Sequence, residues 1–364
     1  MKTDKTKRVK FAEKMLDWTA RNKKYKTQIV PADDAGISKA EKLLSSGEVV
    51  AVATETVYGL AASAFHDGAV KKIYIAKERP GNNPLIVHIT TLNMVYPLVA
   101  EVPAKLNQLA GAFWPGPLTV VMKKSGLIPL IVTGGLDTVA IRMPSHPSIR
   151  KLIDVCGYPL AAPSANSSTR PSPTTAQHVF DDLNGKIPLI LDGGTCEVGV
   201  ESTVVSLAGE KPVLLRPGAI TMEQLQAVLG TVEVAKGVNE APAADSAPLS
   251  PGMSYRHYSP KAKVTLVVGS EDAYLKYLSK NKLNGENVYA LCFGHEGEKS
   301  GLPYLSLGEY EDSVAAQHNL FAALRMADKK GALQVIARCP KKDGEWYALF
   351  NRLQRSAGFE VIEL

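Results

Sequence analysis

The sequence has few cysteines and no close pair of them. The four are Cys156, Cys196, Cys292 and Cys339, and none belongs to a CxxC motif. A zinc site needs closely spaced ligand pairs, and a disulfide framework needs many cysteines in a short chain. We therefore expect reduced thiols, most of them buried.

Long apolar runs are missing as well. No stretch approaches the roughly 20 consecutive apolar residues that a membrane helix needs. The first ten residues are half basic and no apolar core comes after them, which excludes a secretory signal. The apolar fraction of 45% and the charged fraction of 21% are ordinary for a globular protein. We expect a cytoplasmic protein without a membrane contact.

Common catalytic signatures are absent too. The sequence has no GxxxxGK[ST] loop, no HExxH, no GxSxG elbow and no GxGxxG fingerprint. The seven histidines show no ligand-like spacing along the chain. A nucleotide, if bound, is bound without a P-loop, and we expect no metal held by the protein itself.

Positive charge is concentrated at the N-terminus. Residues 1–26 contain ten Lys and Arg against three acidic residues, a net of +7, whereas the remaining 32 basic and 33 acidic residues give −1. The main part of the chain is therefore not a polyanion-binding surface by charge count. We interpret the leader as a solvated, partly helical extension; phosphate contacts with RNA and mitochondrial import are the alternatives.

The length of 364 residues allows two domains, since single cores seldom exceed 250–300 residues. We predict a basic extension over 1–27, an α/β domain over 28–235, a linker over 236–262 and a smaller Rossmann-like α/β domain over 263–364. In the first domain, apolar patterning predicts helices at 37–46, 69–76, 103–113, 149–155, 175–180 and 222–229, and strands at 48–52, 85–89, 118–123, 139–142, 160–162, 189–192 and 202–207. In the second it predicts strands at 264–268, 288–293 and 332–337, and helices at 272–279, 313–328 and 345–356.

The linker is rich in Ala, Pro, Ser and Gly but ends in an unusual way. Ser250–Pro260, SPGMSYRHYSP, contains two Tyr, a His and an Arg. Solvated linkers seldom carry aromatic residues so densely, so we expect this segment to hold a bound group and to serve as a lid as well as a linker.

Four arginines stand one or two positions before a proline: Arg79, Arg142, Arg170 and Arg216. Proline restricts the residue before it to extended geometry and also stiffens the chain at its own position. An Arg in that context loses little backbone freedom on binding, and its planar fork suits phosphate or carboxylate. Each alone could be a surface Arg beside a turn; four together predict an anion clamp.

Three further segments carry polar groups near strand ends, and a fourth is interpreted as structural. Lys77 and Arg79 lie two apart, and in an extended segment both would face one group; a solvated turn after a helix is the alternative. Ala162–Asn166, APSAN, offers a hydroxyl and an amide, although Ser-x-Asn also suits a turn. Thr54–Leu60, TETVYGL, is weak alone, and 113–119, FWPGPLT, is typical of a rigid structural turn.

Together these segments resemble the threonylcarbamoyl-AMP synthase family, which has a YrdC-like domain and, in its long form, a C-terminal extension. The motifs that carry the resemblance are TETVYGL at 54–60, KERPGNNPLIVHI at 77–89, FWPGPLT at 113–119, LDTVAIRMPSHP at 136–147, APSAN at 162–166, RPSPT at 170–174, DGG at 192–194, GVESTVV at 199–205, LRPGAI at 215–220 and SPGMSYRHYSP at 250–260. The match extends from about residue 28 to 364. It implies a twisted, open α/β sheet with a concave basic cleft.

The resemblance also implies roles for individual residues. The catalytic set implied by the match is Lys77, Arg79, Ser164 and Asn166. Threonine would be bound by Thr56, His88, Arg142, Ala162 (through its backbone) and Ser202. ATP would be bound by Arg79, Asn83, Thr138, Ser164, Ser172, Arg216 and Tyr258.

The implied reaction converts L-threonine, bicarbonate and ATP into threonylcarbamoyl-AMP and pyrophosphate, for later modification of tRNA by threonylcarbamoyl transferase proteins. Mg2+ would arrive with ATP. Selecting threonine over valine needs a polar partner for its hydroxyl, because apolar pockets discriminate poorly by size; Thr56 and Ser202 are candidates. Two positions depart from the usual family pattern, Ala53 in place of Pro and Ala61 in place of Gly. We expect modest local effects from both.

Three other functions stay open at this point. An RNA-binding module could use the same cleft and contact tRNA directly. A different ATP-using carbamoyl or acyl transferase would share the phosphate chemistry but take another acceptor. A purely structural partner protein is the third alternative, but so many polar groups in ordered loops argue against it.

Overall fold

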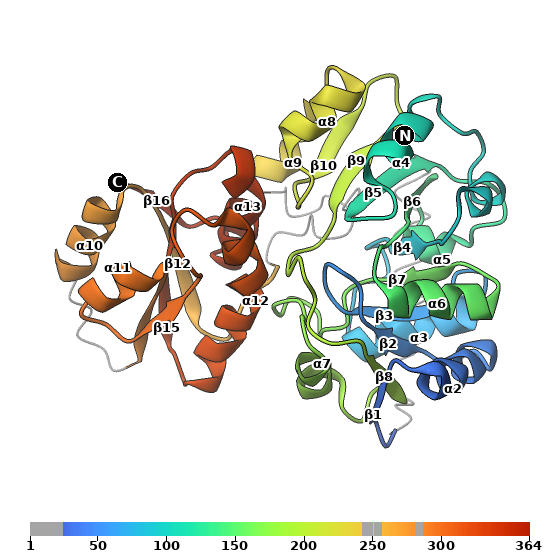
Figure 1. Cartoon of the computed structure of the whole chain (residues 1–364), viewed down its shortest axis with the longest axis horizontal. Coiled ribbons are helices and arrows are strands. Elements are labelled where there is room, and N and C mark those ends of the chain that lie inside the picture. The colour runs from blue at the N-terminus through green and yellow to red at the C-terminus, as the bar shows by residue number, and fades with distance from the viewer. Residues whose placement is uncertain (1–24, 242–249, 251–256, 281–286) are drawn as a thin grey trace.

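The computed structural model describes residues 25–241, 250, 257–280 and 287–364 (Figure 1). Most of the predicted leader, residues 1–24, lies outside these ranges. So do residues 251–256 of the aromatic segment that ends the predicted linker. Within the described ranges the strands form two sheets, one of eleven strands and one of five.

The first sheet is mixed, with strand order β1-β8-β2-β3-β7-β4-β6-β5-β9-β10-β11. Its strands are β1 Gln28–Pro31, β2 Val50–Val52, β3 Gly59–Ser63, β4 Ile86–His88, β5 Leu118–Lys123, β6 Thr138–Arg142, β7 Leu160–Ala162, β8 Leu189–Asp192, β9 Thr203–Ser206, β10 Val213–Arg216 and β11 Glu233–Val234. Most are short, apolar and fully buried, which is why their sequences read as brief apolar runs rather than as alternating patterns.

Helices pack against this sheet (Figure 1). They are α2 Asp34–Ser45, α3 Asp67–Lys77, α4 Lys105–Phe113, α5 Leu130–Thr133, α6 Pro147–Cys156, α7 Ala176–Leu183, α8 Met222–Leu229 and α9 Lys236–Asn239, with 3-10 turns η1 Leu92–Met94 and η2 Tyr96–Leu98. Side-chain caps fix several starts: Asp33 accepts from the Gly36 N–H, and Thr221 forms a capping box with Gln224.

The second sheet is entirely parallel, in the order β14-β13-β15-β12-β16. It consists of β12 Lys263–Val268, β13 Val288–Cys292, β14 Tyr304–Ser306, β15 Gln334–Cys339 and β16 Val361–Glu363, with α10 Glu271–Lys280, α11 Gly294–Lys299, α12 Ser313–Lys329, η3 Gly344–Trp346 and α13 Tyr347–Ser356. The predicted parallel α/β build is confirmed. All six elements predicted for this part of the chain are present, with ends shifted by a few residues.

Helices α12 and α13 lie on the side of the second sheet that faces the first (Figure 1), and their buried side chains share a core with loops of the first sheet. We call the part of the chain built around the eleven-stranded sheet the first unit, and the part built around the five-stranded sheet the C-terminal unit. Val57 and Val200 of the first unit belong to the same buried cluster as Leu320 and Phe321 of α12. Gly199 packs so closely that a Cβ there would lie 2.4 Å from the His318 Cα, and its φ of 78° also favours glycine. The C-terminal unit therefore packs directly against loops of the first sheet.

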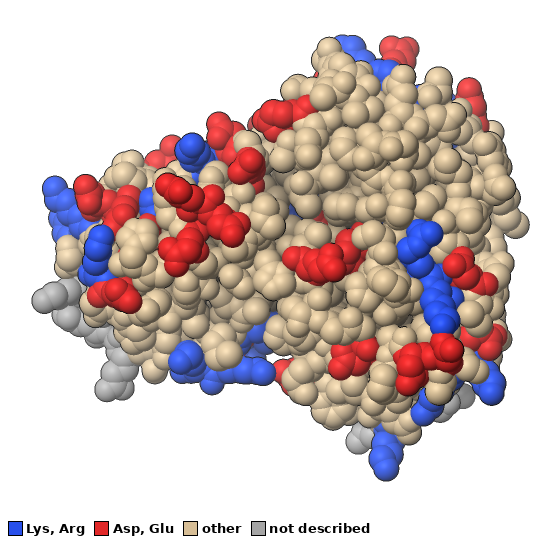
Figure 2. Space-filling view, in the orientation of Figure 1, with Lys and Arg blue, Asp and Glu red and all other residues tan. Residues whose placement is uncertain are grey.

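The described surface carries charges of both signs. On the face shown in Figure 2, acidic and basic side chains are interspersed over both units. The concave basic cleft that the resemblance implies stays a prediction. No helix in the described part of the chain combines the length and apolarity that a bilayer crossing requires.

Candidate active site

A pocket opens where several strands of the first sheet begin or end. It is lined by Thr54, Thr56, Val57, Gly59, Arg79, Ile86, His88, Arg142, Ala162, Pro163, Ser164, Glu201, Ser202, Arg216, His257 and Tyr258. The set joins segments that are far apart in the sequence, including the last described part of the predicted linker. The pocket thus combines three guanidinium groups with hydroxyl groups and backbone from small residues.

Nine of the residues named from the sequence line this pocket. They are Thr56, Arg79, His88, Arg142, Ala162, Ser164, Ser202, Arg216 and Tyr258. Sheet register brings some of them together, because His88 of β4 lies opposite Arg142 of β6, and Thr119 of β5 faces Arg142 from the other side.

Arg142 is fixed by a buried carboxylate that sequence reasoning missed. Its NH2 lies 2.7 Å from Glu55 Oε1, its NH1 donates to Thr56 Oγ1 at 2.8 Å, and its Nε donates to the Gly116 carbonyl. Burial alone would raise the pKa of Glu55, but the charge and hydrogen bond of Arg142 outweigh it and hold the pKa below its usual value. The guanidinium is therefore held in one orientation at the pocket wall.

Arg216 also lines the pocket and is held by the β9–β10 pair. Its Nε and NH2 donate to the Ser202 carbonyl at 3.0 and 2.9 Å, and NH2 also reaches Ser202 Oγ at 3.1 Å. Thr119 Oγ1 lies 2.7 Å from the same hydroxyl. A Cβ on Gly218 would lie 2.4 Å from the Thr203 nitrogen, so the two strand ends are in close contact. Ser202 and Arg216 form one polar unit.

Lys77 and Arg79 do not share an extended segment, so that prediction is wrong. Lys77 is the last residue of α3, and Glu78 caps the helix in the left-handed region at φ 54°. The turn sends the two side chains to different places. Arg79 lines the pocket, with Nε and NH2 donating to the carbonyls of Asn83 and Pro84. Burial lowers the pKa of Arg79 to about 10, which leaves it charged at neutral pH.

Lys77 lies behind the pocket and is fully buried. Its Nζ donates to the carbonyls of Ser164 at 2.5 Å and Asn166 at 2.6 Å. Desolvation, and then the charge of Arg79, lower its pKa well below 10.5. Asn166 continues the network, with Nδ2 donating to the carbonyls of Ser167 and Arg170. Both residues therefore shape the loop that presents Ser164.

The remaining named residues lie outside the pocket lining. Thr138 begins β6, at the opposite strand end from Arg142. Ser172 is buried and its hydroxyl donates to Glu201 Oε1. Asn83 contributes its carbonyl to Arg79 and to the Tyr74 hydroxyl. Of the four Arg-Pro positions, Arg170 is the exception: it pairs with Asp328 of α12 at 2.9 Å instead of joining the clamp.

His88 makes the stability of the fold sensitive to acid. Burial, followed by the charge of Arg142, lowers the pKa of His88 to about 3. Below pH 6.5 the unfolded chain binds a proton that the folded protein does not, so the free energy of unfolding falls as pH falls. Between pH 7.5 and pH 5, we predict that the free energy of unfolding falls by about 2 kcal/mol less in His88→Asn than in the wild type. Urea unfolding at the two pH values measures this.

The control for that experiment is His295→Asn, the same chemical change at an exposed position. Equal acid sensitivity in the wild type and in His88→Asn would contradict the assignment of a neutral, buried His88.

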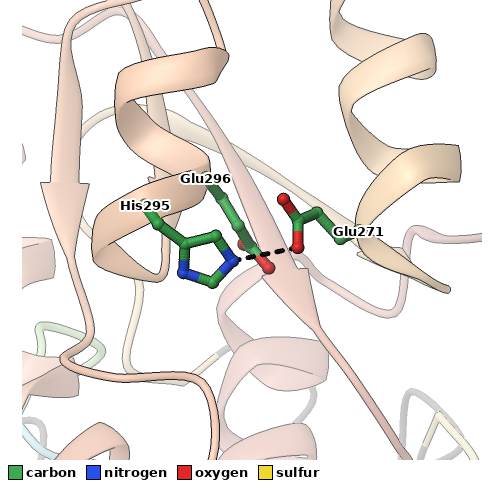
Figure 3. Close-up of side chains that lie close together, drawn as sticks. All are labelled: Glu271, His295 and Glu296. Carbon is green, nitrogen blue, oxygen red and sulfur yellow. Dashed lines mark hydrogen bonds and ion pairs between the residues drawn. The ribbon is translucent and has the colours of Figure 1, made fainter.

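A second polar group lies in the C-terminal unit. Glu271, His295 and Glu296 come close enough to hold a metal ion (Figure 3). Glu271 pairs with His295 at 2.9 Å and with Lys299 at 2.8 Å, whereas Glu296 pairs with Arg338. Ion pairs within the protein thus account for both carboxylates. The sequence alone does not predict this cluster, because Glu271 lies far from His295 and Glu296 along the chain.

Comparisons with known proteins show which family the chain is similar to. A family model described as "Telomere recombination" matches residues 42–218, and one described as "Threonylcarbamoyl-AMP synthase, C-terminal domain" matches residues 220–358. Curated relatives named threonylcarbamoyl-AMP synthase include one from Pyrococcus abyssi, 42% identical over 89% of this chain and 95% of the relative. Another, from Bacillus subtilis, is 43% identical over 92% of this chain and 97% of the relative.

A solved structure gives the same result for the fold. The P. abyssi Sua5 protein complexed with L-threonine has a TM-score of 0.86 and 40% identity, covering 93% of this chain and 98% of that one. The predicted α/β fold with a large twisted sheet and a second, smaller unit is confirmed. Nothing in these comparisons supports the alternative of an RNA-binding module.

Proposed function

This chain belongs to the threonylcarbamoyl-AMP synthase family, and from that premise we propose that it converts L-threonine, bicarbonate and ATP into threonylcarbamoyl-AMP and pyrophosphate. The observation that carries the proposal is the pocket itself, in which Arg79, Arg142 and Arg216 converge with Ser164 and other hydroxyl groups. The enzyme is then a nucleotidyltransferase that acts without a P-loop.

The chemistry explains why the pocket needs so many cations. The threonine amine captures CO2 derived from bicarbonate, and a carbamate oxygen then attacks the ATP α-phosphorus while pyrophosphate leaves. Both reactants are anionic, so catalysis consists mainly of positioning and charge neutralisation. Arg79 and Arg216 would neutralise the phosphates, and Mg2+ would enter as part of the nucleotide substrate.

Threonine binding would use other residues of the same pocket. Arg142 suits the threonine carboxylate, because Glu55 and Thr56 already fix its orientation. His88 and the Ala162 backbone complete the threonine side of the pocket. We assign ATP binding to Arg79, Ser164, Arg216 and Tyr258, which line the pocket, and, on the family resemblance alone, to Asn83, Thr138 and Ser172, which do not line it.

We further propose a catalytic domain over 28–235, a linker over 236–262 and a C-terminal domain over 263–364. His257 and Tyr258 of the linker line the pocket, which supports a role for this segment in closing the site. The product is a labile mixed anhydride, so proteins that transfer threonylcarbamoyl to tRNA must consume it, in the cytoplasm.

The direct test incubates the purified full-length protein with ATP, labelled bicarbonate and one amino acid at a time. Release of pyrophosphate and labelled adenylate with threonine, and weak or no release with valine or serine, is the expected result. Adenylate formed with a different acceptor would favour another carbamoyl or acyl transferase. Salt-sensitive tRNA binding without adenylate would favour the RNA-binding alternative.

Ser202 offers a test of substrate choice. We predict that Ser202→Ala lowers the ratio of kcat/KM for threonine over valine by at least about tenfold, because the threonine hydroxyl loses a polar partner. The ratio is measured by pyrophosphate release with each amino acid. The control is Thr203→Val, which removes the neighbouring hydroxyl that donates to the Ile220 carbonyl outside the pocket. An unchanged ratio in Ser202→Ala would remove this residue from threonine selection.

A further inference from the structure

One arginine of the C-terminal unit contacts the backbone and side chains next to the pocket. Arg352 belongs to α13, and its side chain is fully buried. Its Nε donates to Glu201 Oε2 at 2.8 Å, its NH2 to the Glu201 carbonyl at 3.2 Å, and its NH1 to the Pro217 carbonyl at 2.9 Å. A single guanidinium thus connects two segments of the first unit.

These two segments flank the polar unit of the pocket wall. Because β9 and β10 are antiparallel, Glu201 before one strand and Pro217 after the other lie at the same end of the pair. Each adjoins a residue that lines the pocket: Ser202 comes directly after Glu201, and Arg216 precedes Pro217. Arg352 therefore fixes the backbone on both sides of the Ser202–Arg216 contact.

Arg352 also contacts the end of the linker. Its guanidinium carbon lies 5.4 Å from the centroid of the Tyr258 ring, which packs on Phe321 of α12. One side chain thus contacts two residues that line the pocket, Glu201 and Tyr258, and a third, Pro217, that follows Arg216.

The buried charge of Glu201 explains why an arginine is needed there. Glu201 is deeply buried and accepts from the Ser172 hydroxyl at 2.5 Å and from Arg352. Burial would raise the pKa of Glu201, but the charges of Arg352 and Arg216 outweigh it and hold the pKa below its usual value. A lysine could balance that charge, but its single nitrogen cannot occupy the three separate positions from which the guanidinium donates to the carboxylate and to two carbonyls.

We propose that Arg352 is a positioning residue for the adenylation pocket, through which the C-terminal α/β unit holds Ser202 and Arg216 in binding geometry. The inference rests on the proposed function and deepens it. It assigns to the C-terminal unit a part in substrate binding, although no side chain of β12–β16 or their helices lines the pocket among the described residues.

The test compares Arg352→Lys and Arg352→Met with Arg338→Met in the full-length protein. Arg338 is the matched control, because it is a buried arginine of the same unit that pairs with Glu296 and does not line the pocket. Pyrophosphate release gives KM for threonine and for ATP, and thermal unfolding gives the stability of each variant.

We expect Arg352→Lys to fold and to raise KM for threonine and for ATP by at least about fivefold each, since the lysine keeps the charge but not the three contacts. Arg338→Met should lower the melting temperature and leave both KM values unchanged, because loss of folded protein lowers apparent kcat without altering KM. Arg352→Met leaves Glu201 unpaired; if it does not fold, the double variant Glu201→Gln/Arg352→Met replaces it and should also show raised KM values.

Wild-type KM values in Arg352→Lys would overturn the inference, as would equal increases in Arg338→Met. Failure of the proposed function is distinguishable, because the wild type itself would then release no threonine-dependent pyrophosphate. In that case calorimetric binding of a non-hydrolysable ATP analogue to the wild type and Arg352→Lys tests the positioning role. Weaker binding to the variant supports it, and equal binding overturns it.

Discussion

Arg79→Ala is expected to lower kcat for threonylcarbamoyl-AMP formation by about 10³-fold, the size of effect seen when one preorganised charge is removed from a developing anion. Arg79 lines the pocket, and hydrogen bonds to the carbonyls of Asn83 and Pro84 hold its side chain. In the proposed reaction, attack of a carbamate on a phosphorus bearing negative oxygens concentrates negative charge, and we assign its neutralisation to this guanidinium. Single-turnover pyrophosphate release at saturating ATP and threonine measures the loss.

The chain provides a matched control for this variant. Arg170 also precedes a proline in the first unit, but it pairs with Asp328 and lies outside the pocket. Arg170→Ala should keep kcat within about twofold of the wild type, because the Arg170 side chain pairs with Asp328 and does not line the pocket. If Arg79→Ala folds and turns over within about fivefold of the wild type, Arg79 is not part of the catalytic set.

Sequence patterning predicts the smaller sheet better than the larger one. Its strands β12, β13 and β15 are buried runs of five or six mostly apolar residues separated by helices, and that alternation favours a parallel sheet. Its edge strands β14 and β16 have only three residues each, too few for a periodic signal.

The larger sheet contains strands with no local signature. Strand β3, Gly59–Ser63, is made of Gly, Ala, Leu and Ser, which have modest strand propensity, and its sequence alone indicates the end of a turn. It is a strand because it lies between β2 and β7, where small side chains fit between close neighbours. Strand β10, Val213–Arg216, is likewise marked in the sequence only by its terminal arginine. Tertiary packing decides both.

At the site, the cations are predictable and their counter-charges are not. The position before proline marks Arg79, Arg142 and Arg216, but it cannot show that burial requires carboxylates beside two of them. Glu55 and Glu201 each stand among hydroxyl and apolar residues next to a strand, in TETV and VEST. An acidic residue in such surroundings is a usable signal, because a buried charge needs a partner. Arg352 gives no signal beyond its place in a predicted helix.

Lys77→Met is expected to lower the free energy of unfolding by about 3 kcal/mol, because two buried carbonyls lose a donor that is not replaced. We also expect kcat/KM to fall about 10²-fold, since a shift near 1 Å in the loop that carries Ser164 misplaces a pocket residue. Lys77 Nζ bonds the carbonyls of Ser164 and Asn166 and does not line the pocket. Urea unfolding and pyrophosphate release measure the two effects.

The pH dependence of the free energy of unfolding tests whether Lys77 releases its proton when the protein folds. Desolvation, with the charge of Arg79, holds the pKa of Lys77 well below 10.5 in the folded protein. Between the folded and unfolded pKa values the unfolded chain binds a proton that the folded protein has released, so the free energy of unfolding rises with pH. The difference in free energy of unfolding between the wild type and Lys77→Met should therefore grow as pH rises toward 10.5. A constant difference would mean that Lys77 keeps its proton on folding, which would contradict the lowered pKa.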